Sequence, residues 1–193
     1  ELAGEAAYWI GESNVRLEDF DNAIKYFTLG YDNYPKNRLR DYSLYSIAWT
    51  FQKKSDYAKA TQWYERFLKE FPESVLAASA KVRIGECYYY EKDYRKAIEV
   101  LSQSRGTIQQ ADERGEADYL IAEAFYQQSD FPEAQRRYET FLKDYPNHKL
   151  QREVTYALGW SQLKQNNFAD AAQSEEGDML RRAMGKKDQE VMQ

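Results

Sequence analysis

One short phrase occurs twice in this chain, and its spacing reveals a longer repeat. Residues 64–74 are YERFLKEFPES, and residues 138–148 are YETFLKDYPNH, which begin 74 residues later. Pro35 and Pro72 stand 37 residues apart, and Pro146 follows Pro35 at three times that distance. The chain is therefore built from copies of a 37-residue unit, and the phrase recurs in alternate copies.

Several columns of equivalent positions obey this period in five copies, and they predict two helices in each copy. In the first helix, an aliphatic residue precedes a small one that lets a neighbouring helix approach closely. These pairs are Ile10-Gly11, Ile47-Ala48, Ile84-Gly85, Ile121-Ala122 and Leu158-Gly159. An Asp or Asn is expected to cap the second helix by accepting a backbone N–H. An aromatic residue follows each cap, and an Ala stands three residues further on, and both are expected to face inward. The caps are Asp19, Asp56, Asp93, Asp130 and Asn167.

Turn residues are scarce, which favours a helical chain over a chain of strands. The sequence has nine Gly and four Pro in 193 residues, whereas strands need frequent turn signals. A residue that precedes proline avoids helical backbone angles. The Tyr-Pro or Phe-Pro pairs are therefore expected to end the second helix of a copy.

The repeated pattern resembles the tetratricopeptide repeat (TPR) family over about residues 3–173. The residues that carry the resemblance include Leu44, Ile47, Ala48, Phe51, Ala60, Tyr64 and Pro72. The resemblance implies an all-α, right-handed superhelical solenoid of about five helix-turn-helix units, whose first helices line a concave groove. The chain departs from the family in the length of its unit, which is about three residues longer than the usual 34.

Two segments are predicted. Residues 1–173 form the TPR array, which is expected to be a fragment of a longer array because the chain begins on a repeat boundary. Residues 174–193 leave the register, since Glu175 falls on a column of core residues, where a buried charge is costly. This tail is interpreted in three ways: a capping helix, a helix that docks on a neighbouring molecule, or a foreign segment. Residues 178–187 resemble a short segment of the alpha subunit of bacterial DNA polymerase III.

The groove implied by the TPR resemblance is predicted to bind a partner through aromatic and acidic side chains. Tyr and Trp offer a large, rigid contact area with a polar tip, and acids favour a neutral or basic partner over an acidic one. The alternative for any single ring is packing between first helices. The predicted partner-binding residues are Tyr8, Glu12, Tyr45, Trp49, Glu86, Tyr89, Tyr119, Glu123, Tyr126, Tyr156 and Trp160.

Composition and motifs argue against several other functions. The net charge of −5 is unsuited to wrapping nucleic acid, which needs a basic surface. No apolar run approaches the roughly 20 residues that span a bilayer. The sequence contains no motif for catalysis, a metal or a cofactor. His148, the single histidine, is expected at a surface turn, and Cys87 is expected to be a buried, inert thiol.

The function predicted is that of a non-catalytic protein–protein interaction scaffold. The long repeats and their Tyr-Pro endings resemble bacterial cell-envelope TPR proteins, such as the coordinator of the Tol–Pal system and the lipoprotein of the barrel-assembly machinery. That resemblance implies a periplasmic location. Two alternatives remain open: a structural array that self-associates through its ends, and a glycan-binding helical module.

Overall fold

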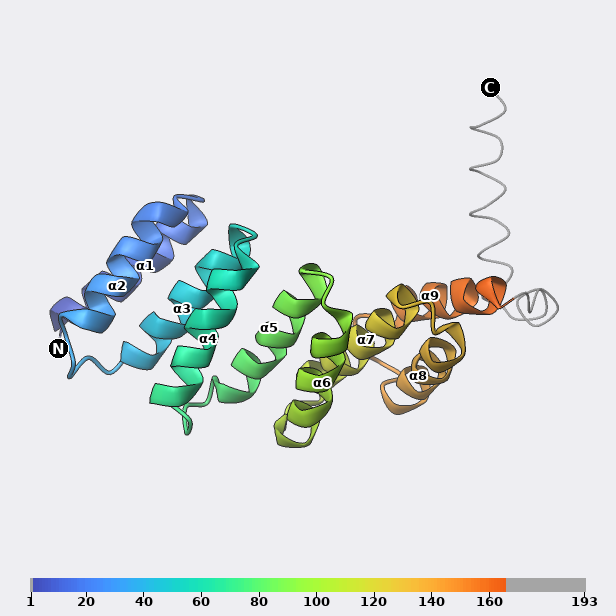
Figure 1. Ribbon diagram of the computed structural model, residues 1–193. Coiled ribbons are helices and arrows are strands. Elements are labelled where there is room, and N and C mark those ends of the chain that lie inside the picture. The colour runs from blue at the N-terminus through green and yellow to red at the C-terminus, as the bar shows by residue number, and fades with distance from the viewer. Residues whose placement is uncertain (1, 166–193) are drawn as a thin grey trace, which may run out of the picture. The chain divides into compact units, whose positions relative to one another are not determined.

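The structure, a computed structural model, describes residues 2–165 and is entirely helical over that range (Figure 1). The all-α class and the helical-repeat fold predicted from the sequence are confirmed. The predicted cap Asn167, the column residues Phe168 and Ala171, and the predicted tail at 174–193 lie outside the described residues. The elements are α1 (Leu2–Arg16), α2 (Phe20–Asp32), α3 (Arg40–Lys53), α4 (Tyr57–Glu70), α5 (Ala77–Tyr90), α6 (Tyr94–Ser104), the 3-10 turn η1 (Arg105–Thr107), α7 (Ala111–Gln127), α8 (Phe131–Asp144) and α9 (Gln151–Lys164).

The chain divides into two compact units, residues 1–109 and a second unit that begins at Gln110. In the first unit the hairpins α1/α2, α3/α4 and α5/α6 follow one another, and α2 and α4 each also pack against the helix after them. In the second unit α8 packs against both α7 and α9. A single array over residues 1–173 stays a prediction.

The boundary between the units coincides with an irregular copy of the repeat. Gln109 stands where the other second helices are followed by proline. There α6 ends at Ser104 and continues as the turn Arg105–Thr107, so this helix has 11 residues where α4 and α8 have 14. The loss of the proline therefore accompanies a different exit from the second helix.

The turn between the two helices of each hairpin has the same two features at adjacent positions: a capping aspartate and a left-handed residue before it. The predicted caps are confirmed at Asp19, Asp56, Asp93 and Asp130, whose carboxylates each accept the backbone N–H three residues ahead. The residue before each cap has a left-handed backbone, which non-glycine residues seldom adopt, and the sequence analysis did not anticipate it. The left-handed residues, with φ between 59° and 64°, are Glu18, Ser55, Lys92 and Ser129.

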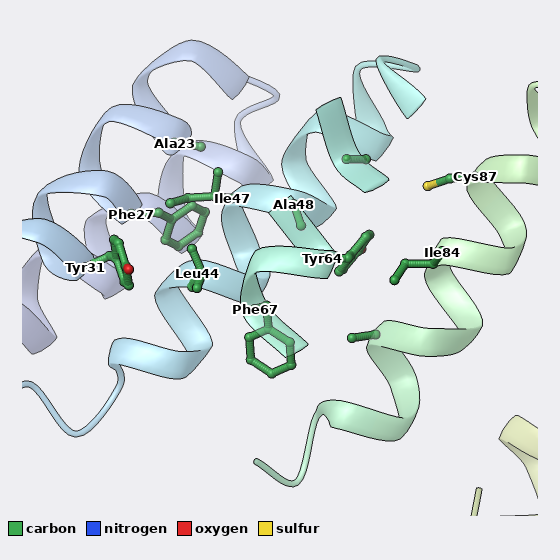
Figure 2. Close-up of a cluster of buried hydrophobic side chains, with 12 residues drawn as sticks. Ala23, Phe27, Tyr31, Leu44, Ile47, Ala48, Tyr64, Phe67, Ile84 and Cys87 are labelled. Atoms are coloured by element: carbon green, nitrogen blue, oxygen red, sulfur yellow. The ribbon is translucent and has the colours of Figure 1, made fainter. Parts of the chain in front are cut away.

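The predicted inward columns form the core of the first unit (Figure 2). Ile47 and Ala48 are fully buried against side chains of α2 and α4, and Ile84 lies in the same cluster with 5% of its surface exposed. A Cβ added at Gly11 would lie 2.6 Å from two ring atoms of Phe27, so the small residue does permit close helix contact. The Ala column is fully buried at Ala23, Ala60, Ala97 and Ala134. The aromatic column is only half-buried, at Phe20, Tyr57, Tyr94 and Phe131.

His148 is a buried residue, so its placement at a surface turn was wrong. Only 7% of its surface is exposed, and its ring meets the ring of Phe141 edge to face at 5.2 Å. Nδ1 accepts the backbone N–H of Leu150 at 3.1 Å, which places the ring proton on Nε2, 3.0 Å from the carbonyl oxygen of Asp112. The imidazole satisfies one backbone group at the start of α7 and one at the start of α9, and this requirement explains its burial.

Two other repeats use a shorter side chain to accept the backbone N–H two residues further on, as His148 does for Leu150. Asn37 lies two residues after Pro35, and its Oδ1 accepts the N–H of Leu39 at 3.0 Å. Ser74 does the same for Leu76 at 3.3 Å. An acceptor two residues after the proline that follows a second helix (Pro35, Pro72 and Pro146) is thus a further feature of the repeat. The sequence analysis missed it because the acceptor is a different residue type in each copy.

A polar network joins α2 to α4 beside the core. The Tyr31 hydroxyl donates to Oε2 of Glu70 at 2.5 Å, and Nε of Arg66 donates to Oε1 of Glu70 at 2.9 Å. Arg40 adds a second cation, 3.7 Å from Glu70. Burial alone would raise the pKa of Glu70, but the hydrogen bonds from Tyr31 and Arg66 and the two cations lower it.

Glu70→Gln is expected to alter the pH dependence of stability. A carboxylate with a lowered pKa stabilises the fold above its ordinary pKa of 4.5, and this contribution is lost as pH falls through the folded value. At pH 7 the variant should lose about 0.5–1 kcal/mol, the scale of a partly exposed ion pair. The difference from wild type should shrink as urea unfolding is repeated from pH 6 down to about pH 3. Glu73→Gln, at an exposed site, is the control, and a difference that is constant with pH would contradict the assignment.

Candidate functional site: the α7–α9 groove

The predicted binding residues all lie on the first helices of their repeats, as expected. Ten of the eleven are half-buried, and the side chain of Tyr156 is exposed. In chain order, α1 carries Tyr8 and Glu12, α3 carries Tyr45 and Trp49, α5 carries Glu86 and Tyr89, α7 carries Tyr119, Glu123 and Tyr126, and α9 carries Tyr156 and Trp160.

The five predicted residues of the second unit share one open pocket of about 310 Å³ between α7 and α9. We call it the α7–α9 groove. The sequence analysis missed two of its lining residues, one acidic and one small. The seven lining residues are Tyr119, Glu123, Tyr126, Glu153, Tyr156, Ala157 and Trp160.

Aromatic rings form most of the groove surface, and two carboxylates stand among them. The ring of Tyr156 meets that of Trp160 edge to face, with centroids 6.0 Å apart. Burial raises the pKa of Tyr126, and the charge of Glu123 and the Tyr156 ring add to the rise. Oε1 of Glu123 accepts the hydroxyl of Tyr138 at 2.5 Å, which fixes the carboxylate against α8. This arrangement suits a ligand with a flat or apolar part and a positive charge.

In the first unit, the corresponding space holds an arginine of the chain itself. Nη1 of Arg83 lies 2.7 Å from both carboxylate oxygens of Glu86, and the guanidinium also hydrogen-bonds Tyr45 on α3. Burial acts to lower the pKa of Arg83, but the charge and hydrogen bonds of Glu86, together with the interactions of Tyr45, outweigh it and raise the pKa. Glu86 accepts Nε2 of Gln52 at 2.7 Å as well. Its carboxylate is therefore used within the unit.

The remaining predicted residues make contacts inside the first unit. The Tyr8 hydroxyl bonds with Ser46 and Glu12, and burial raises the pKa of Tyr8 to about 12. The Tyr89 ring packs edge to face on Tyr94 at 5.5 Å. Trp49 lies under Nζ of Lys53, 4.9 Å from its ring centroid. Of these contacts, only the one between Tyr8 and Ser46 joins two first helices. The Tyr89 ring packs on the second helix of its own hairpin, and Trp49 and Lys53 share α3.

The described residues were also searched for other kinds of site. Between residues 2 and 165, no three His, Cys, Asp or Glu side chains gather in a way that could hold a metal ion. None of the helices in that range has the length and apolarity needed to cross a bilayer. Cys87 is fully buried, and burial raises the pKa of its thiol to about 12, which disfavours the thiolate form.

Paired helices repeated in register, with a lined groove on the first helices, define a TPR protein. Residues 4–37 and 42–74 each match a tetratricopeptide repeat. Residues 77–192 match the YfiO family, described as outer membrane lipoprotein, and the chain belongs to this family. The match extends across residues 178–187, and the polymerase resemblance of that segment finds no support.

Solved structures agree on the fold at low sequence identity. A TPR protein from Parabacteroides merdae is 12% identical with a TM-score of 0.76, covering 96% of this chain and 68% of that one. MamA from Desulfovibrio magneticus RS-1 is 18% identical with a TM-score of 0.74, covering 96% and 97%. BtubC from P. vanneervenii is 18% identical with a TM-score of 0.74, covering 94% and 80%. A search of curated proteins found no match.

Proposed function

We propose that the chain is a non-catalytic scaffold that binds an extended segment of a partner protein in the α7–α9 groove. TPR proteins are protein-interaction modules, and the observation that supports this particular site is the groove itself. Five residues chosen from the sequence for binding line one pocket together with Glu153 and Ala157. Rigid aromatic side chains around a recess are typical of the sites that contribute most to binding energy.

We further propose that the partner belongs to a bacterial envelope assembly and that the protein works in the periplasm. This proposal is supported by membership of a family described as outer membrane lipoprotein. The two groove carboxylates favour a neutral or basic segment over an acidic one, because an acidic segment would meet like charge.

Site-specific photocrosslinking in a native lysate tests the site. A benzophenone amino acid replaces Tyr156, which is 45% exposed on the groove. A matched probe replaces Lys143, which is exposed on α8. We expect a distinct crosslinked partner with the Tyr156 probe and not with the Lys143 probe.

The same probe is then combined with Tyr126→Ala and Trp160→Ala, after circular dichroism has shown that the variant folds. These changes remove two groove walls, so the crosslinked band should fall at least tenfold. Equal crosslinking from position 143, or a band that survives the groove changes, would place binding elsewhere on the protein.

A further inference from the structure

The internal repeat pairs the residues of the α7–α9 groove with residues of α3 and α5, two repeats earlier. Both sets have a tyrosine at the same position on the earlier helix. The Trp and the Glu of the two sets have exchanged helices, and the arginine of the α3–α5 set is an alanine in the α7–α9 groove. With a shift of 74 residues, the pairs are Tyr45 with Tyr119, Trp49 with Glu123, Arg83 with Ala157, and Glu86 with Trp160.

In the α3–α5 set, an arginine of the chain itself is bound by these side chains. The guanidinium of Arg83 lies against a carboxylate of its own helix α5 at 2.7 Å and hydrogen-bonds a tyrosine of α3, so it bridges the two helices. Only 13% of the Glu86 side chain remains exposed in this ion pair. The charge of the guanidinium and its hydrogen-bonding edge are used together.

The α7–α9 groove keeps the tyrosine, as Tyr119, but Ala157 stands in place of the arginine. Its carboxylate lies on the opposite helix, at Glu123, because the position of Glu86 is taken by Trp160. Ala157 is too short to cross from α9 to α7, and the pocket of about 310 Å³ lies beside it. Tyr119, Glu123 and Trp160 line this pocket, and Glu153 adds a second carboxylate one turn before Ala157. The seven lining residues include two acids and no basic residue, so the pocket is complementary to a cation.

We propose that the α7–α9 groove binds an arginine side chain of its partner, which takes the place that Arg83 fills within the first unit. This inference rests on the proposed function, because it names the chemistry of the bound segment. A guanidinium fits better than an ammonium, since it stacks flat on aromatic rings while its edge pairs with a carboxylate. The groove would thus receive from another molecule the arginine that the first unit supplies from its own chain.

Peptide selection on the full chain tests the proposal without knowledge of the natural partner. Random 12-residue peptides displayed on phage are selected on the immobilised protein, and clones are kept only if Trp160→Ala abolishes their binding. We expect arginine to be enriched in these groove-dependent peptides. Synthetic copies are then measured with arginine, with lysine, and with citrulline, which has nearly the same shape as arginine and no charge.

The expected order of affinity is the arginine peptide first, then the lysine peptide, then the citrulline peptide. The citrulline peptide should bind at least tenfold more weakly than the arginine peptide. On the protein, Glu123→Gln should weaken the arginine peptide several-fold, whereas Glu139→Gln on α8 should leave its affinity unchanged. Ala157→Arg should abolish binding by placing a guanidinium in the pocket in cis. Glu139→Arg, which puts the same group at an exposed site on α8 outside the pocket, should leave binding intact.

Two failures can be told apart. Groove-dependent peptides that bind equally well with citrulline would overturn the arginine proposal and leave the groove as a binding site. A selection in which no peptide depends on Trp160 would overturn the groove as a binding site, and the arginine proposal with it.

Discussion

Ile84→Ala should lower the free energy of unfolding by about 2–5 kcal/mol, the range for buried aliphatic side chains cut to alanine. Ile84 is 5% exposed and belongs to a cluster that includes Tyr64, Phe67 and Cys87 (Figure 2). Removal of three carbon atoms leaves a cavity among side chains of two hairpins, which rigid helices cannot collapse to fill. Urea unfolding followed by circular dichroism measures the loss.

The repeat supplies a matched control at the same column. Ile10 is equivalent to Ile84 in sequence but is 42% exposed on α1. Because much of its side chain already contacts water, Ile10→Ala should cost less than about 1 kcal/mol, nearer to the effect of surface substitutions. Similar losses of unfolding free energy at the two sites would mean that burial does not determine how much an aliphatic residue of this column stabilises the fold.

Gly11→Ala should destabilise the first unit by about 1–2 kcal/mol, despite the better helix propensity of alanine. The new Cβ would lie 2.6 Å from two ring atoms of Phe27, and that ring is fully buried and cannot swing aside. Overpacking of this kind costs about 1–3 kcal/mol. The propensity gain of about 1 kcal/mol offsets only part of it. The measurement is again urea unfolding.

Gly106→Ala is the control for this substitution. A Cβ at Gly106 would have nothing within 4 Å, in the short turn after α6. Its unfolding free energy should stay within about 0.5 kcal/mol of wild type, as at other exposed sites. If Gly11→Ala instead raised the free energy of unfolding, the prediction would be wrong. That result would show that Phe27 can shift and that helix propensity decides the outcome.

The parts of this fold that follow local rules could be predicted from the sequence. A cap such as Asp130 depends on its own carboxylate and an N–H three residues away, so the residue type and its position suffice. The Ala and Ile columns could be found because burial repeats every 37 residues. The groove positions of the second unit followed from the same register, since helical spacing places Tyr119, Glu123 and Tyr126 on one face.

The parts that depend on two helices at once could not be predicted. Glu86 was grouped with the groove acids, but Arg83, three residues earlier on the same helix, pairs with it. That ion pair follows from i,i+3 spacing and was overlooked, whereas the hydrogen bond from the guanidinium to Tyr45 depends on how α5 lies against α3. His148 was placed at the surface because its role depends on a carbonyl 36 residues earlier in the chain. Comparison of Arg83 with Ala157, its equivalent 74 residues later, could have shown from the sequence that only the first unit supplies its own arginine at this position.

In the first unit, helices pack mainly against the helices next to them in the chain, and this has a genetic consequence. Unequal crossing-over between two copies of the repeat adds or removes 37 residues and leaves the remaining hairpins with neighbours of the same kind. Duplicated copies are then free to diverge. One copy carries an arginine that is bound within its own unit, and a sister copy carries alanine at the same position. If the proposed arginine site exists, divergence between copies converts an intramolecular contact into a recognition site, or the reverse, without any change of fold.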